Sequence, residues 1–229
     1  MSWSWEKYWS DKTDGQHRYQ NDEFIKYEVR EVLYHLNGGN SLLDFGCGSG
    51  QLLVKLSPEF ERVTGVDFSQ SMLDNAQKNI ENLMIENIRL IRADDKSMWE
   101  KIDNNYDRIM NWGVVQYLSE DQIDYFVKKS SEILNPDGKI IFFSVIDPRL
   151  FDLWKAGFFS DNYNSILFLI RVLKIKFVNI FKRPPKDILG YAYPAFMFQY
   201  LGQKYGFQTE FAKSMYYEYR YHVILSKLE

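Results

Sequence analysis

The feature that most constrains this fold is the stretch from Ser41 to Leu53, where a short apolar segment runs into a glycine turn and then into a second apolar segment. Its first five residues predict a buried strand with one acid, Asp44, near the end. Three glycines follow in alternation: Gly46, Gly48 and Gly50. Glycine suits backbone that takes positive φ values or lies against a ligand. A strand, a glycine turn and a helix N-terminus form a nucleotide-shaped site at the carboxyl edge of a parallel sheet.

A second short apolar segment, which starts at Arg62, also ends in an acid, Asp67. Asp67 follows Gly50 by 17 residues, close to the spacing of about 20 at which a carboxylate binds ribose hydroxyls in dinucleotide folds. The glycine spacing itself is G-x-G-x-G, which differs from the G-x-G-x-x-G of those folds and weakens a dehydrogenase interpretation.

The rest of the chain alternates predicted strands and helices. Strands are expected at 63–67, 88–91, 106–110 and 139–145, and helices at 24–36, 51–56, 70–83 and 120–134. Another helix at 194–205 and two strands at 207–211 and 219–227 follow. This alternation predicts an α/β fold with a doubly wound (Rossmann-like), mostly parallel sheet.

Composition limits the remaining possibilities. The chain has 229 residues, 45% of them hydrophobic, which suits a single α/β domain over residues 1–229 with added segments. A net charge of −3 favours no nucleic-acid partner. The first residues lack the pattern of a signal peptide, so a cytoplasmic location is expected. Cys47 is the one cysteine and is expected to fill the glycine turn, and no Cys/His cluster offers a metal site.

Five motifs with family-specific spacing occur in order along the chain. They are Asp44–Gly50, Val66–Ser69, Ala93–Asp95, Tyr106–Asn111 and Leu134–Lys139. With them the sequence resembles class I S-adenosylmethionine-dependent methyltransferases, well over residues 25–148 and more loosely from 195 to the end. The resemblance implies a seven-stranded sheet with an antiparallel C-terminal strand around Tyr221–Leu225. It also implies S-adenosyl-L-methionine as the cofactor and S-adenosyl-L-homocysteine as the product.

The resemblance further implies which residues hold the methionine and ribose parts of the cofactor. The backbone of Gly46, Cys47 and Gly48 would approach the methionine part. Asp44 would take its amino group, directly or through water. Asp67 would accept from the two ribose hydroxyls.

The same resemblance assigns the adenine end and the sulfonium. Phe68 would lie against the adenine ring, with Met72 close by. Asp94 would accept from the adenine amine, with the Asp95 amide beside it. The carbonyl of Asn111 would lie near the sulfonium.

Residues 1–24 form an unusual N-terminal segment with a cluster of aromatic residues: Trp3, Trp5, Tyr8 and Trp9. They predict either a helix packed on the outside of the domain or a lid segment over the cofactor, as relatives often have here. In a lid, Arg18 could face the cofactor carboxylate. His17 is the first candidate for a general base, since imidazole exchanges protons near neutral pH.

Four residues after the central strands are expected to contact the substrate: Trp112, Gln116, Asp147 and Tyr191. Tyr193 is the second catalytic candidate, because relatives place substrate contacts just before the late helix. Gln116 stands where relatives often carry a histidine, which argues against base catalysis from that position.

Residues 148–193 are expected to form a helical insert on the substrate side of the sheet. Within it, 165–183 is apolar and basic, with too many charges for a transmembrane span. At helical spacing one broad apolar face can pack on the domain; it comprises Ile166, Leu169, Ile170, Leu173, Phe177, Ile180 and Phe181. Leu167, Val172, Ile175 and Val178 lie off that face, so some apolar area is also expected on the outside. Two interpretations stay open for this helix, a lid over the substrate pocket or a surface that docks on a membrane or a protein partner.

The sequence therefore predicts a methyltransferase that acts on an O or N nucleophile of a small molecule, such as a biosynthetic intermediate. One alternative is a methyltransferase-fold binding or membrane-surface module without turnover. Another is an enzyme for a lipid-linked or carrier-bound substrate. The methyl acceptor and the oligomeric state do not follow from the sequence.

Overall fold

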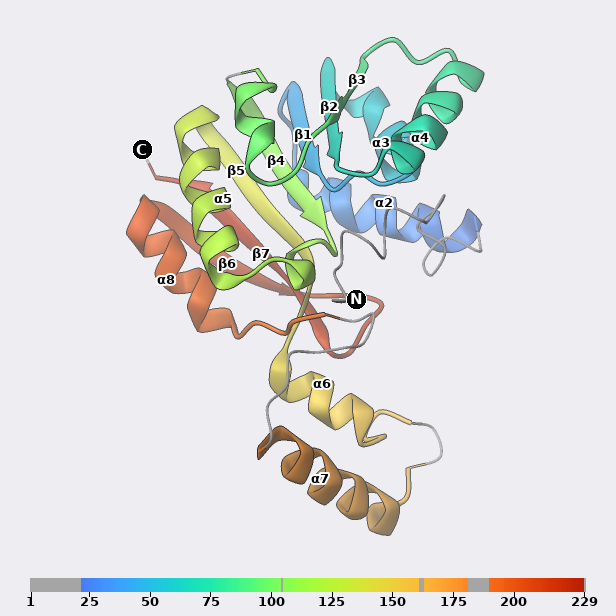
Figure 1. The fold of residues 1–229 in the computed structure, drawn as a ribbon, viewed down its shortest axis with the longest axis vertical. Helices are drawn as coiled ribbons and strands as arrows, with labels where there is room; N and C mark the ends of the chain where they lie inside the picture. Colours follow the sequence, from blue (N-terminus) through green and yellow to red (C-terminus); the bar gives the residue numbers. More distant parts are fainter. Residues whose placement is uncertain (1–21, 104, 161–162, 181–189, 229) are drawn as a thin grey trace, which may run out of the picture.

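The computed structural model describes residues 22–103, 105–160, 163–180 and 190–228 (Figure 1). The N-terminal segment 1–21, with His17 and Arg18, lies outside these residues. The predicted lid segment is therefore not part of the structural account.

A single seven-stranded sheet forms the centre of the domain, in the order β3-β2-β1-β4-β5-β7-β6. The strands are β1 (Ser41–Phe45), β2 (Arg62–Asp67), β3 (Ile88–Arg92), β4 (Tyr106–Trp112), β5 (Leu134–Ile146), β6 (Phe207–Lys213) and β7 (Arg220–Lys227). Strands β1 to β5 pair in parallel, and β7 is antiparallel to both β5 and β6. The predicted doubly wound sheet with an antiparallel C-terminal strand is confirmed.

Helices cover both faces of this sheet (Figure 1). Helices α2 (Asp22–Leu36) and α3 (Gln51–Leu56) pack on one face, and α5 (Glu120–Ile133) and α8 (Ala195–Tyr205) on the other, while α4 (Gln70–Asn82) lies beside α3. Successive residues of a strand serve opposite faces, so Leu42 belongs to the core under α2 and α3, whereas Leu43 belongs to the core under α5 and α8. This alternation decides which of the two helical layers each strand side chain packs against.

The start of α4 follows directly from the sequence. Ser69 adopts extended backbone, and its hydroxyl accepts a hydrogen bond from the Met72 backbone N–H, the geometry of an N-cap. Ser69 is thus the N-cap of α4. Because Ser69 comes two residues after β2, the cap also fixes the chain where the Asp67 carboxylate leaves the sheet.

A turn at residues 135–138 lies inside β5 rather than before it, although the sequence predicted the strand only from 139. Leu134 pairs with Tyr106 and Lys139 pairs with Arg108, so four residues of β5 stand opposite one residue of β4. Asp137 has a φ of 61°, as expected for a turn residue. The turn is therefore present as an irregularity between two paired parts of the same strand.

The insert after β5 forms two helices, α6 (Pro148–Lys155) and α7 (Ser165–Ile180), which project away from the sheet (Figure 1). The broad apolar face of α7 is largely exposed, with Ile166 at 70% and Phe177 at 64% exposure. The helix packs on α6 through its other side, where Phe168, Val172 and Ile175 are partly buried. Among the helices that the structure describes, none has the length and apolar character needed to cross a bilayer.

Candidate active site

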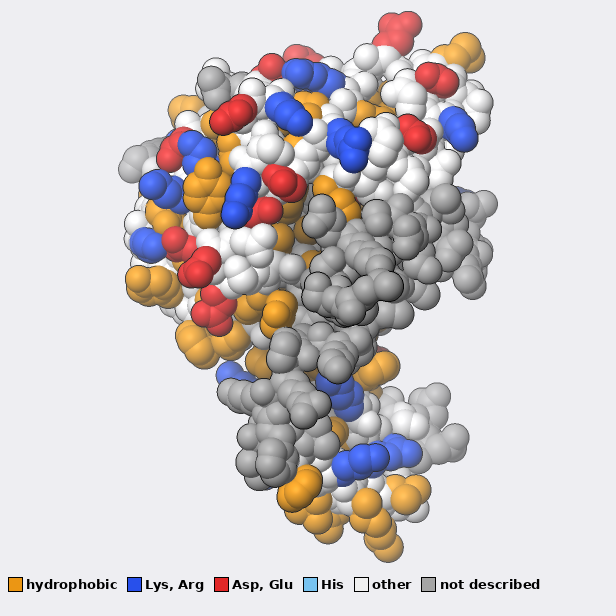
Figure 2. Space-filling view, in the orientation of Figure 1, with side chains coloured by type: hydrophobic (Ala, Val, Ile, Leu, Met, Phe, Trp, Pro, Cys, Tyr) orange, Lys and Arg blue, Asp and Glu red, His pale blue; other side chains and the backbone are white. Residues whose placement is uncertain are grey.

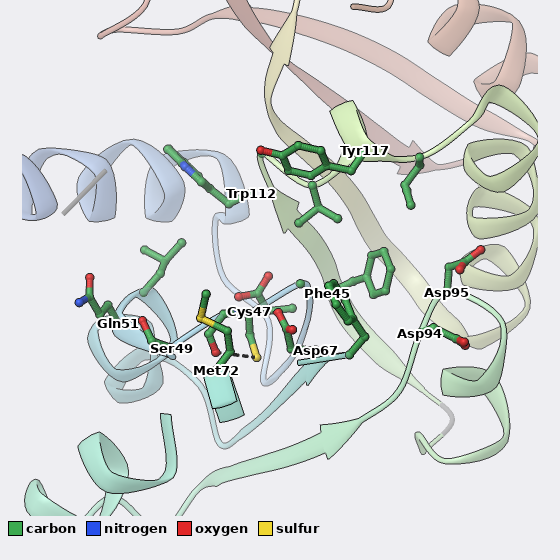
Figure 3. A pocket seen from close by; sticks show the side chains of 18 of the residues that line it. Phe45, Cys47, Ser49, Gln51, Asp67, Met72, Asp94, Asp95, Trp112 and Tyr117 are labelled. Atoms are coloured by element: carbon green, nitrogen blue, oxygen red, sulfur yellow. Dashed lines mark hydrogen bonds between the residues drawn. The ribbon is translucent and has the colours of Figure 1, made fainter. Parts of the chain in front are cut away.

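A cavity of about 390 Å³ lies at the carboxyl ends of the parallel strands β1, β2 and β4 (Figure 3). Its lining comprises the glycine turn after β1, the acid at the end of β2, and the segments that follow β3 and β4. The lining residues named in the sequence analysis are Asp44, Gly46, Cys47, Gly48, Asp67, Phe68, Met72, Asp94, Asp95 and Trp112. Residues that are distant in the chain thus meet at one edge of the sheet, where open α/β folds bind their ligands.

The glycine turn closes β1 against β2. The backbone N–H groups of Gly46 and Cys47 both donate to the carbonyl of Val66, at 2.7 and 3.0 Å. Gly46 has a φ of 80°, and a Cβ there would lie 2.3 Å from Val114 Cγ2. Gly48 has a φ of 56°, but a Cβ there would meet nothing within 4 Å. Gly46 is therefore required by packing, while Gly48 leaves open space along the cavity wall.

Asp67 ties this turn to the end of β2. Its Oδ2 accepts from the Gly48 backbone N–H at 2.9 Å, and its Oδ1 accepts from the Ser69 backbone N–H at 2.9 Å. Burial raises the pKa of Asp67 above its ordinary value, although these backbone donors act in the opposite direction. The carboxylate is thus buried, oriented by two backbone groups and placed on the cavity wall.

Asp44 is the buried acid at the end of β1. Its side chain is 2% exposed, and its Oδ1 has no hydrogen-bond partner among the described residues. Burial first, and then the neighbouring Asp67 charge, raise the pKa of Asp44 to about 8. A buried acceptor without a partner is costly, and a cationic group in the cavity would remove that cost. Asp44 therefore fits an ammonium ligand.

Cys47 lies in the same turn as a free cysteine of intermediate residue exposure. Burial, followed by the charges of Asp67 and Asp44, raises the pKa of this thiol well above its ordinary value. A thiol held in its protonated form is a poor nucleophile. These surroundings favour a packing role for Cys47.

Asp94 and Asp95 reach the cavity from the turn after β3. Asp94 Oδ1 accepts from the Ser97 hydroxyl and backbone N–H, both at 2.7 Å, and these bonds lower the pKa of Asp94. Asp95 Oδ2 accepts from Gln122 Nε2 at 3.0 Å, which links this turn to the start of α5. The Asp94 carboxylate thus caps its own turn, while the Asp95 carboxylate is fixed by a partner across the cavity.

The two residues at the end of β4 have different positions. Trp112 lines the cavity and stacks on Phe143, with ring centroids 5.2 Å apart. The Asn111 side chain is fully buried and lies outside the cavity lining, and neither of its amide atoms has a partner among the described residues. Asn111 can therefore act on the cavity only through its backbone.

Sequence analysis missed several lining residues, chiefly Ser49, Gln51, Val114, Tyr117, Leu118 and Gln122. Most of them follow β1 or β4 within ten residues, at the same edge of the sheet as the acids. Their nearness to a predicted strand end was therefore a usable signal. Figure 3 shows that Tyr117 and Trp112 lie on one side of the cavity, across from Met72 and Gln51.

The expected substrate residues do not all reach this cavity. Gln116 is 1% exposed, and its Oε1 accepts from Arg220 Nη1 at 3.0 Å. Asp147 caps α6 by accepting from the Arg149 and Leu150 backbone N–H groups. Tyr191 is 38% exposed, and its backbone N–H donates to the Gln116 carbonyl at 2.7 Å. None of these three lines the described cavity.

Tyr193, the second catalytic candidate, is buried below α8. Its hydroxyl donates to the Leu118 carbonyl, and burial raises the pKa of the phenol above its ordinary value. The phenol is held as a hydrogen-bond donor, which is unfavourable for a proton acceptor. Leu118, whose carbonyl accepts this hydrogen bond, lines the cavity. Tyr193 is therefore connected to the cavity through the Leu118 backbone.

A buried polar network beneath this region was not predicted. Glu31 Oε1 lies 3.0 Å from His222 Nε2, and the backbone N–H of Ser144 donates to His222 Nδ1 at 3.0 Å. Arg220 Nη1 donates to the Ser144 carbonyl at 2.7 Å, and Ser144 has a φ of 64° near the end of β5. The network joins α2, β5 and β7, which are far apart in the sequence.

No group of three or more histidine, cysteine or acidic side chains that could hold a metal occurs within the described ranges. The described lining of the cavity offers carboxylates, backbone amides and aromatic rings.

The comparisons with known proteins agree on one kind of protein, a methyltransferase. Residues 42–138 match the methyltransferase domain family. A Saccharomyces cerevisiae protein described as a probable S-adenosylmethionine-dependent methyltransferase is 28% identical over 130 residues, which are 56% of this chain and 44% of that protein. Cyclopropane mycolic acid synthase 3 of Mycobacterium tuberculosis is 24% identical, with the same two shares. The chain thus spans less than half the length of these two relatives.

The fold has a solved counterpart of nearly equal length. The N-methyltransferase NodS of Bradyrhizobium japonicum, solved with S-adenosyl-L-homocysteine, superposes with a TM-score of 0.65 and 14% identity over 98% of this chain and 97% of that one. An identity this low shows the fold alone. Together with the matched family and the five motifs, it defines a class I methyltransferase fold. The matched family model, the relatives and the solved structures all support a class I S-adenosylmethionine-dependent methyltransferase family.

Proposed function

We propose that this protein is an S-adenosylmethionine-dependent methyltransferase and that the cavity beside the glycine turn binds the cofactor. The observation that carries the proposal is the arrangement of Asp44, Gly48 and Asp67 on one wall. It combines a buried acid that lacks a partner, a backbone with open space in front of it, and an oriented acceptor. These three features match the ammonium, the methionine chain and the ribose of S-adenosyl-L-methionine.

Asp67 would accept from the two ribose hydroxyls. An ionised carboxylate has about four acceptor positions, and the backbone donors around Asp67 leave part of this capacity for the ribose hydroxyls. Phe68 and Met72, which line the cavity next to Asp67, supply apolar surface for the adenine ring.

Asp44 would hold the ammonium of the methionine part at the other end. The contact between the ammonium and this carboxylate requires an ionised Asp44, which its raised pKa opposes until a cation arrives. Gly48 would let the methionine chain lie against the backbone, because a side chain at this position would project into the open space along the wall.

The cofactor would supply an electrophilic methyl group on a sulfonium. The residues of this chain orient the two reactants and exclude water, the main contribution that a protein makes to an in-line displacement. Trp112 and Tyr117 lie across the cavity from the glycine turn, and we assign the acceptor to their side (Figure 3). We assign the acceptor as an O or N nucleophile of a small molecule, which attacks the methyl group from this side.

Calorimetric titration with S-adenosyl-L-methionine and S-adenosyl-L-homocysteine tests the proposal. The wild-type protein is expected to bind both, and Asp67→Ala to bind at least about tenfold more weakly, since a hydrogen bond to a charged group contributes about 1.5–3 kcal/mol. Asp74→Ala is the matched control. Its carboxylate is exposed on α4 and accepts from Gln70 Nε2 at 2.7 Å. Unchanged affinity in Asp67→Ala would contradict the assignment.

A turnover assay separates the enzyme from a binding module. An enzyme converts the cofactor to S-adenosyl-L-homocysteine only when an acceptor is present, so acceptor libraries of hydroxyl and amine compounds can be screened for its release. Tight cofactor binding without turnover on any acceptor would favour the alternative of a methyltransferase-fold module.

A further inference from the structure

Helix α7 has apolar side chains on two opposite sides. The side that faces α6 carries Phe168, whose ring lies 5.7 Å from the ring of Phe158. The opposite side carries Ile166, Ile170, Leu173 and Phe177, which are 57–70% exposed. Their spacing of four, three and four residues places them in one stripe along the helix. This set of four residues is called the exposed stripe below.

An exposed stripe of this kind is unusual on a soluble domain. Single exposed apolar residues are common, but contiguous apolar patches mark interaction sites. The stripe follows the helix for three turns, and Leu167 and Leu169 beside it are also at least half exposed. In Figure 2 apolar side chains gather at the end of the molecule formed by α7, with basic side chains next to them.

The charges around the stripe have one sign. Lys174 and Lys176 lie on either side of it, each about 80° around the helix from its centre at 100° per residue. Both lysines are exposed, and no acid occurs between residues 163 and 180. Arg171, by contrast, is directed to α6, where its Nη1 lies 3.5 Å from the Ala156 carbonyl. Two lysines are thus free to place their charges at the boundary between apolar and polar surroundings.

We propose that the exposed stripe of α7 binds the surface of an anionic lipid bilayer, with the helix axis in the plane of the membrane. An apolar stripe bordered by lysines is the pattern of an interfacial helix, whose apolar side chains enter the acyl region while its lysines meet lipid phosphates. A second copy of the chain would bring the same lysines together, without acids on α7 to oppose them. Charge complementarity therefore favours an anionic lipid surface.

The position of α7 makes this surface independent of cofactor binding. Helix α6 follows β5 directly, so the insert leaves the sheet from the edge at which the cavity lies. None of the described cavity residues belongs to α6 or α7. Docking would bring the cavity edge to the bilayer while the cofactor site stays intact. Loss of docking and loss of cofactor binding can thus be measured separately.

Flotation with vesicles tests the proposal in the 229-residue chain. We expect wild type to float with phosphatidylglycerol/phosphatidylcholine vesicles at low salt, and much less with phosphatidylcholine alone. Ile170→Glu/Leu173→Glu should abolish flotation. Leu83→Glu/Met84→Glu is the matched control, because these residues are 57% and 87% exposed at the end of α4 and should not affect flotation. Lys174→Gln/Lys176→Gln should weaken binding by about fivefold for each lysine.

Three outcomes would overturn the proposal. They are wild type that stays unbound with the anionic vesicles, flotation that survives Ile170→Glu/Leu173→Glu, and equal binding to both kinds of vesicle. A wild-type dimer that these substitutions convert to a monomer, without any vesicle binding, would assign the stripe to a second copy instead. Cofactor titration of the same variants should match wild type, which shows that the variants are folded.

Discussion

The backbone N–H of Gly48 donates to Asp67 Oδ2 at 2.9 Å, so the glycine turn after β1 and the acid after β2 form one unit. The bond explains why the two motifs belong together. The turn orients the carboxylate, and the carboxylate fixes the backbone that the cofactor would touch. Asp44, which opens into the same cavity, completes a wall with two acids and no basic partner among the described lining residues.

The pH dependence of cofactor binding should follow Asp44. In the free protein its pKa is raised to about 8, so the side chain is protonated at pH 6. An ammonium beside it favours the carboxylate, so binding should release a proton, and affinity should rise with pH by up to about tenfold per unit between pH 6 and pH 7.5. Titration in two buffers with different ionisation enthalpies measures this proton. Asp44→Asn should release none from this site, and equal proton release in wild type and Asp44→Asn would contradict the account.

Two glycines of the turn should respond differently to alanine. At Gly46 a Cβ would lie 2.3 Å from Val114, so Gly46→Ala should lower the free energy of unfolding by about 1–3 kcal/mol through overpacking and strain. At Gly48 a Cβ would meet no protein atom, so Gly48→Ala should cost only the left-handed backbone, about 1 kcal/mol. Cofactor affinity should nevertheless fall in Gly48→Ala. Denaturant unfolding and calorimetry on both variants check this, and the reverse ranking in stability would contradict it.

The buried Glu31 should stabilise the fold through His222. Burial acts to raise the pKa of Glu31, but the contact with His222 and the bond from the Met215 backbone N–H together lower it below its ordinary value of 4.5. The stabilisation is therefore present above pH 4.5 and is lost as the pH falls through the lowered pKa. Glu31→Gln should cost about 1.5–3 kcal/mol at pH 7.

Unfolding curves at pH 7 and at pH 3.5 measure this contribution. The difference between wild type and Glu31→Gln should become smaller at the lower pH. Glu86→Gln, an exposed acid before β3, should have little effect at either pH. A stability difference for Glu31→Gln that grows as the pH falls would contradict the assigned sign.

The parts of the structure that sequence analysis predicted are local. Each strand and its terminal acid occupy a few consecutive residues, and parallel pairing then brings Asp44 and Asp67 to the same edge. The contact between Gln116 and Arg220 spans 104 residues, and no local pattern in either segment indicates it. The same applies to Glu31 and His222, because a buried glutamate within a helix resembles an exposed one in sequence.

The insert shows a different limit. Helical spacing correctly grouped Ile166, Ile170, Leu173 and Phe177 on one face, but it could not tell which of two apolar sides would meet the rest of the protein. Phe168, Val172 and Ile175 form the shorter apolar side, and aromatic contacts with the α6–α7 connection select it for packing. Which apolar side of α7 is buried depends on the surface that it packs against. That surface, formed by α6 and the α6–α7 connection, becomes visible only in the structure.

A crystal structure with S-adenosyl-L-homocysteine tests the central claim most directly. We predict that the ribose hydroxyls lie within about 2.6–3.2 Å of the Asp67 carboxylate oxygens, with the ligand's ammonium at Asp44 and its sulfur directed to the side of Trp112 and Tyr117. The Gly48 N–H should still donate to Asp67 in the complex. A ligand bound outside this cavity, or one whose ribose has no contact with Asp67, would contradict the account.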